Sequence, residues 1–91
     1  MSRDTLRDEI CSEIAHLFRE ERLRRKLSLN ALAAQAGLNR RTVTFLETKQ
    51  RTPTIDTLLR LTDVLEIRLE DLIRKARKNA SSKAQPKQRP G

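Results

Sequence analysis

The stretch from Gly37 to Gln50, GLNRRTVTFLETKQ, holds the side chains best suited to recognition chemistry. At about 100° per residue of a helix, Val43 and Leu46 fall on one side, as core residues would. The opposite side carries Arg40, Arg41, Thr44, Phe45 and Thr48. A guanidinium can donate paired hydrogen bonds to guanine, threonine offers a hydroxyl or a methyl group, and phenylalanine can touch the methyl group of thymine. Taken alone, however, charged residues on a helix more often form an ordinary solvated surface.

Catalytic chemistry has few candidates in this chain. His16 is the only histidine and Cys11 the only cysteine. No carboxylate pair, glycine loop or metal-ligand spacing accompanies them, so we expect neither an enzyme nor a bound metal or cofactor. A single cysteine also excludes an internal disulfide. We expect Cys11 to be a small apolar residue on a helix.

Length and composition favour one small, all-α domain. The chain has 91 residues, with two glycines, three prolines and no tryptophan or tyrosine. No run alternates apolar and polar residues in the way that a half-buried strand does. No apolar run reaches the about 18 residues that suggest a membrane span, and no signal peptide is recognisable. We therefore expect a soluble, cytoplasmic protein.

The positive charge is concentrated at the C-terminal end. Residues 74–91 carry seven lysines and arginines and no acid, whereas residues 1–73 carry thirteen against twelve acids. The net charge of +8 therefore indicates a polyanionic partner without locating its site in the folded part. After residue 78 no apolar residue larger than alanine remains. We expect a domain over residues 1–78 and a flexible, disordered basic tail over 79–91.

Apolar spacing predicts a long first helix that ends near residues 26–27. Its apolar stripe is Leu6, Ile10, Ile14, Leu17 and Phe18. Near the other end of the chain, a fourth helix should reach Leu65 and a fifth should begin at Leu69. Because an apolar helical extension needs a surface to cover it, the first turns should pack on the fifth helix or on a second subunit.

Two short helices joined by a tight turn lie between these. They cover residues 29–36 and 40–48, with Ser28 and Asn39 as N-caps and Gly37 supplying the positive φ that the turn needs. This spacing is typical of a helix-turn-helix. It places the polar face on the second of the two helices, which is the one that enters the major groove of DNA in such motifs.

The sequence resembles the Cro/phage-repressor type helix-turn-helix, also called the XRE family. The matching residues are Ser28, Leu32, Ala33, Ala36, Gly37, Leu38, Thr42, Val43, Leu46, Glu47, Pro53, Thr54, Thr57, Leu58, Leu61, Leu65, Ile67, Leu69 and Leu72. With Ile14, Phe18 and Arg22 upstream, the resemblance spans roughly residues 14–73. It implies a lambda-repressor-like bundle of five helices, here with an extended first helix, and double-stranded DNA as the partner.

The resemblance also implies roles for individual residues. Base contacts fall on Arg40, Arg41, Thr44 and Phe45. Contacts to the DNA backbone fall on Ser28, Leu29, Asn30, Asn39, Thr42, Lys49, Gln50, Arg51 and Thr52. Arg22 and Glu47 occupy the positions of a structural ion pair that ties the first helix to the third. Phe45 could instead pack partly against the neighbouring loop.

Three residues depart from the family pattern. Leu29 stands where glutamine is common, so one side-chain contact to DNA is missing. Lys49 and Glu66 stand where glycine is common, at the ends of the third and fourth helices. We expect the chain at Lys49 either to be strained or to take another turn.

Together these features predict a sequence-specific transcriptional regulator. We expect a dimeric repressor on a palindromic operator, with half-sites about 34 Å apart. The residues expected at the dimer interface are Leu69, Leu72, Ile73, Leu6 and Ile10. Two other functions use the same compact fold. One is an antitoxin that also represses its own operon and binds a protein partner, and the other is a restriction–modification controller.

Overall fold

The computed structural model describes residues 3–84, and the side chains of residues 5–82. Its helices are α1 (Arg3–Arg24), α2 (Leu29–Ala36), α3 (Arg40–Glu47), α4 (Ile55–Leu65) and α5 (Leu69–Ala84). Within this part of the chain there is no strand, which confirms the predicted all-α class and the order of five helices.

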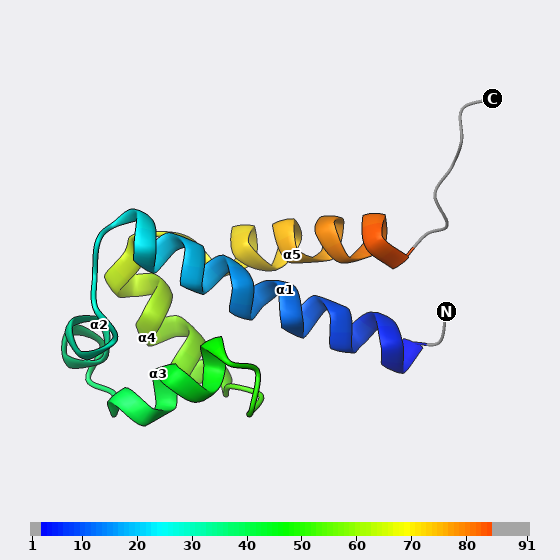
Figure 1. Ribbon diagram of the computed structural model, residues 1–91. Coiled ribbons are helices and arrows are strands. Elements are labelled where there is room, and N and C mark those ends of the chain that lie inside the picture. The colour runs from blue at the N-terminus through cyan, green and yellow to red at the C-terminus, as the bar shows by residue number, and fades with distance from the viewer. Residues whose placement is uncertain (1–2, 85–91) are drawn as a thin grey trace.

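The helices form a cluster of short elements at one end of a long hairpin (Figure 1). α1 and α5 pack along each other, and we call this pair the α1–α5 hairpin. α2 packs on both α3 and α4, and α3 also contacts α1. The start of α1 and the end of α5 lie together, away from α2, α3 and α4 (Figure 1). α3 therefore lies at the opposite end of the molecule from the start of α1 and the end of α5 (Figure 1).

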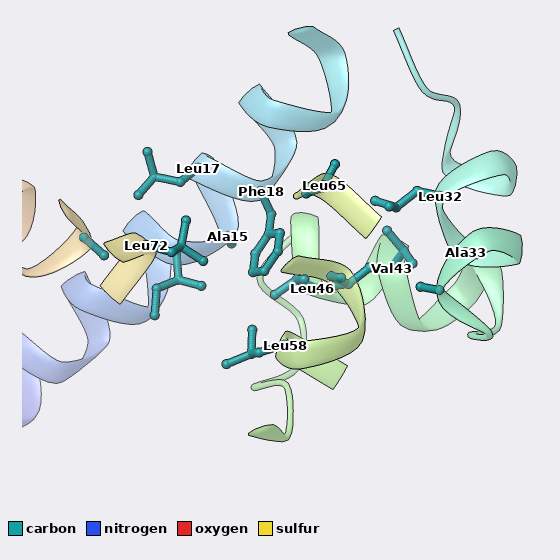
Figure 2. Packing of buried hydrophobic residues seen from close by; sticks show 14 residues of the cluster. Ala15, Leu17, Phe18, Leu32, Ala33, Val43, Leu46, Leu58, Leu65 and Leu72 are labelled. Atoms are coloured by element: carbon teal, nitrogen blue, oxygen red, sulfur yellow. The ribbon is translucent and has the colours of Figure 1, made fainter. Parts of the chain in front are cut away.

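The core joins α1 to the cluster. Its largest fully buried side chains are Phe18, Leu32, Leu61, Leu65 and Val43. Phe18 reaches from α1 toward the cluster, with Leu46 of α3 close by (Figure 2). Full burial of one such side chain contributes about 1.5–3 kcal/mol. Because Val43 and Leu46 are 0% and 3% exposed, this burial fixes which face of α3 points outward.

The N-terminal turns of α1 are covered by α5 of the same chain, one of the two alternatives left open by the sequence. Ala76 and Ala80 are fully buried, and these small side chains let the two helices approach closely. Asn79 Nδ2 donates a hydrogen bond of 3.3 Å to Oε1 of the buried Glu13. Leu72, expected at a dimer interface, is only 7% exposed because it lies on this intramolecular face. Leu72 therefore has little surface left to contribute to the expected dimer interface.

α5 continues to Ala84, so the boundary expected at residue 78 falls inside a helix. The expectation rested on the absence of apolar residues larger than alanine. An alanine such as Ala80 can still be a core residue when its helix packs closely against another. Residues 85–91 of the expected tail lie outside the described residues.

The first four helices end in the same type of turn. A residue with positive φ follows each of them: Lys26 (58°), Gly37 (69°), Lys49 (62°) and Glu66 (56°). After α3, the N–H of Lys49 donates to the carbonyl of Leu46 at 3.1 Å, and the N–H of Gln50 to that of Phe45 at 2.9 Å. This is the paired bonding of a Schellman turn. Lys49 thus keeps the turn that glycine usually makes, in a left-handed conformation that costs roughly 1–2 kcal/mol.

The same turn explains why α1 is shorter than expected. The N–H of Lys26 donates to the carbonyl of Leu23 at 2.9 Å, and that of Leu27 to the carbonyl of Arg22 at 3.0 Å. The helix therefore ends at Arg24 and not at residues 26–27.

Candidate nucleic-acid interface

Three N-caps, of which Ser28 and Asn39 were predicted, set the starts of α2, α3 and α4. Ser28 Oγ accepts from the N–H of Ala31 at 3.0 Å, and Asn39 Oδ1 accepts from the N–H of Arg41 at 2.7 Å. Thr54 Oγ1 accepts from the N–H of Thr57 at 3.1 Å, at the start of α4. Each cap satisfies a backbone donor that the helix itself leaves free. The chain direction at the start of α2, α3 and α4 is thus fixed locally.

Gly37 is favoured between α2 and α3 for two reasons. Its φ of 69° is a conformation that side chains disfavour. A Cβ atom there would also lie 3.1 Å from Nη1 of Arg60. That guanidinium reaches across from α4 and donates to the carbonyl of Ala36 at 3.4 Å. The turn is therefore bonded to α4 as well as to its own helix.

The outer face of α3 has the side chains that the sequence pattern placed there. Arg40 and Arg41 are exposed, and Thr44 and Phe45 are half-buried. These four residues line one shallow hollow together with Asn39. The residues predicted to contact bases are thus brought together on one surface.

A second hollow lies between α3 and the loop that leads to α4. It is lined by Asn39, Arg41, Thr42, Phe45, Leu46, Arg51, Thr52, Pro53, Thr54 and Thr57. The guanidinium carbon of Arg51 lies over the ring of Phe45, 5.2 Å from its centroid. Such a cation–π contact explains why Phe45 is only half-exposed at an outward position. Phe45 thus packs against the loop, which was one of the two possibilities left open by the sequence. It also lines both hollows, which together we call the recognition surface.

The predicted backbone contacts are only partly brought together. Thr42, Arg51 and Thr52 line the second hollow, which the start of α4 also lines. Neither hollow is lined by the residues expected at the start of α2, which are Ser28, Leu29 and Asn30. Leu29 is half-buried against the core, so its side chain is committed to packing.

Thr54 and Thr57 line the second hollow, although the sequence assigned them no contact. Thr54 is exposed, whereas Thr57 is 8% exposed. The available signal was the cap itself, because a capped helix start presents free N–H groups.

Arg22 and Glu47 form the ion pair that the resemblance implied. Nε of Arg22 donates to Oε2 of Glu47 at 2.7 Å, and Nη2 donates to Oε1 at 2.9 Å. The side chains of Arg22 and Glu47 are 10% and 5% exposed. The hydrogen bond to Glu47 raises the pKa of Arg22, although burial opposes the shift. Nη1 of Arg22 also donates to the carbonyl of Leu27 at 2.8 Å, so one guanidinium ties α1, its terminal turn and α3 together.

This pair also removes the one acid from the recognition surface. Residues 28–55 contain a single acid, Glu47, against four bases, which are Arg40, Arg41, Lys49 and Arg51. Glu47 is buried and neutralised by Arg22. Within the described side chains, none of Arg40, Arg41 and Arg51 has a carboxylate partner. This surface is therefore positive without internal compensation, which favours a polyanion.

A family model of the helix-turn-helix matches residues 18–72. The chain belongs to the Cro/phage-repressor type (XRE) family of helix-turn-helix proteins. The matched part of this XRE-family chain runs from the middle of α1 to the first turn of α5, and contains all of α2, α3 and α4. Comparison with curated proteins and with solved structures found no match. The family is one of DNA-binding regulators, and this chain accordingly carries a DNA-binding helix-turn-helix domain.

The residues considered for catalysis do not come together. His16 is exposed and contacts Glu20, with 3.0 Å between Nε2 and Oε2. Cys11 is half-buried and lines a different hollow, between α1 and the loop at Lys49. Among the described residues, no group of three or more histidines, cysteines and acids is arranged to hold a metal. No helix in that part of the chain is long and apolar enough to cross a membrane.

Proposed function

We propose that this XRE-family chain is a sequence-specific regulator of transcription that inserts α3 into the major groove of double-stranded DNA. The observation that carries the proposal is the uncompensated outer face of α3. Val43 and Leu46 hold the opposite face in the core, so Arg40 and Arg41 project in a fixed direction. The N-terminal part of such a helix meets the base edges in related motifs.

The contacts divide into those that read bases and those that position the protein. Arg40, Arg41, Thr44 and Phe45 are the base-reading set. A bidentate arginine–guanine contact contributes about 1–3 kcal/mol of discrimination against the wrong base. Phosphate contacts come from Thr42, Asn39 and the loop residues Lys49, Gln50, Arg51 and Thr52. The free N–H groups at Ser28, Leu29 and Asn30 provide a further phosphate contact at the start of α2.

A homodimer is part of the proposal, because one α3 contacts too few base pairs for useful specificity. Two copies would occupy a palindromic operator with half-sites about 34 Å apart. Four of the residues expected at the interface, Leu6, Ile10, Leu69 and Ile73, are half-buried in the single chain and keep some apolar surface. Occlusion of a promoter by the bound dimer would repress transcription. Sedimentation that finds only monomer at tens of micromolar protein would contradict the dimer.

Selection of bound sites from random DNA tests the proposed function. Wild-type protein should enrich one palindromic motif. Arg40→Ala and Arg41→Ala should each lose preference at particular positions of that motif, because each removes one pair of hydrogen bonds to a base. A wild-type protein that enriches no motif would rule out sequence-specific binding.

An antitoxin function is the second candidate. The observation that favours it is that the start of α1 and most of α5 lie outside the matched residues 18–72. This part of the α1–α5 hairpin is available to hold a protein partner while α3 binds DNA. If a toxin gene adjoins the gene for this chain, co-expression should restore growth. Growth arrest that persists in the presence of folded protein would contradict this function.

A further inference from the structure

Phe45 is the one aromatic ring of this chain at the recognition surface. The sequence has two phenylalanines and no tyrosine or tryptophan, and Phe18 is fully buried. Phe45 lines both the hollow shared with Arg40 and Thr44 and the hollow shared with Arg51. A ring has no donor or acceptor to offer a base edge. Its available contact in the major groove is with the 5-methyl group of a pyrimidine.

Arg51 is held beside this ring and is not directed away from α3. Its guanidinium carbon lies 5.2 Å from the ring centroid of Phe45, and no carboxylate of the described residues binds it. An arginine that only neutralises a phosphate needs no fixed orientation. A guanidinium placed over a ring is preorganised, so less rotamer entropy is lost for each hydrogen bond that it makes. The contact therefore brings a loop arginine back to the base-reading face.

We propose that Phe45 and Arg51 act as one unit that reads a thymine next to a guanine. The ring of Phe45 contacts the thymine methyl group, and Arg51 donates two hydrogen bonds to O6 and N7 of the adjoining guanine. Bases stack about 3.4 Å apart along a strand, so two groups separated by 5.2 Å can reach neighbouring base pairs. The unit rests on the proposed function, and it moves Arg51 from the backbone contacts to the specificity determinants.

Modified DNA tests the unit one atom group at a time. The probe is the motif selected by the wild-type protein, which should contain a thymine beside a guanine in each half-site. Replacing that thymine by deoxyuridine removes only the methyl group and should weaken binding about fourfold, which corresponds to about 0.8 kcal/mol for one buried carbon group. Replacing the guanine by 7-deazaguanine removes the N7 acceptor and should weaken binding by a similar factor. Replacing thymine by 5-methylcytosine should retain the methyl contact, and unmodified cytosine should lose it.

Protein variants establish that the two residues act together. In the Phe45→Leu variant, replacing thymine by deoxyuridine should weaken binding less than it does in the wild-type protein. Adding Arg51→Ala to this variant should also cost less affinity than Arg51→Ala costs in the wild-type protein. Arg51→Lys keeps the charge without the planar fork, so it should lose sensitivity to 7-deazaguanine while keeping the salt dependence of binding. The Arg51 variants change an exposed side chain, so their melting temperatures should equal that of the wild-type protein.

The outcomes separate this inference from the proposed function. A selected motif without a thymine beside a guanine, or equal affinity for thymine and deoxyuridine probes, overturns the unit while sequence-specific binding stands. Additive effects of Phe45→Leu and Arg51→Ala also overturn it. If the wild-type protein enriches no motif, the proposed function fails first.

Discussion

The recognition surface and the rest of the molecule use arginine differently. Outside that surface, most arginines of the described residues form ion pairs with carboxylates. These pairs are Arg24 and Arg25 with Glu21, Arg60 with Asp56, Arg68 with Glu70, and Arg74 with Asp71. Hydrogen bonding from Arg24 lowers the pKa of Glu21 accordingly. On the recognition surface, Arg40, Arg41 and Arg51 have no such partner among the described residues.

The difference shows why net charge did not locate the site. Exposed ion pairs contribute only about 0–1 kcal/mol each, so their main effect here is to cancel charge outside the interface. Lack of a partner is not enough by itself, because Arg19 and Arg77 are also exposed without a carboxylate partner among the described residues. What distinguishes Arg40 and Arg41 is their place on the outer face of α3, where both line one hollow together with the ring of Phe45.

The largest expected effect on stability comes from removing the buried ion pair between Arg22 and Glu47. Arg22→Ala leaves Glu47 buried without its partner, so the free energy of unfolding should fall by about 3–5 kcal/mol. Urea denaturation measures the change. DNA affinity should fall only through unfolding. Arg24→Ala is the matched control, because its partner Glu21 lies in an exposed pair and the loss should stay below about 1 kcal/mol.

An Arg22→Ala protein that melts like wild-type would contradict this role for the pair. The same is true of a variant that remains fully folded at the assay temperature and yet loses DNA binding. The second result would make Arg22 part of the interface.

A smaller effect concerns the turn that ends α3. Lys49→Gly should stabilise the fold by about 1 kcal/mol, because removal of most of the left-handed penalty outweighs the entropy that glycine adds to the unfolded chain. Lys49→Ala removes the same charge but keeps the penalty, so the difference between the two variants isolates the backbone term. Thermal denaturation measures both. Equal melting temperatures for the two variants would show that Lys49 is unstrained.

The smallest expected effect concerns the basic end of the chain. Deletion of residues 85–91 removes Lys87 and Arg89 and keeps the buried Ala80. If both charges contact phosphates, the slope of log affinity against log salt should flatten by up to about 1.8 units. Salt titrations of binding measure this slope. The selected motif should stay the same, and a changed motif would place these residues among the base contacts.

The helical parts of the site could be predicted from the sequence because their signals are local. The spacing of Val43 and Leu46 predicted the inner face of α3. The capping residues Ser28 and Asn39 predicted where α2 and α3 begin. The sequence left packing of Phe45 against the loop as an alternative, but it could not name Arg51 as the partner, because that contact depends on the path of the loop. The sequence placed the end of α5 too early, because a pattern of large apolar residues does not reveal an alanine that is buried by close helix packing, such as Ala80.

The most direct measurement compares two substitutions that remove the same charge. Arg41→Gln changes the recognition surface, whereas Arg77→Gln changes α5, which lies across α1 from α3 (Figure 1). Both side chains are exposed and lack a carboxylate partner among the described residues. On the selected operator, Arg41→Gln should weaken binding by about 5- to 150-fold, the equivalent of about 1–3 kcal/mol, and Arg77→Gln should leave affinity nearly unchanged. Equal losses from the two variants would show that overall charge, and not the outer face of α3, directs binding to DNA.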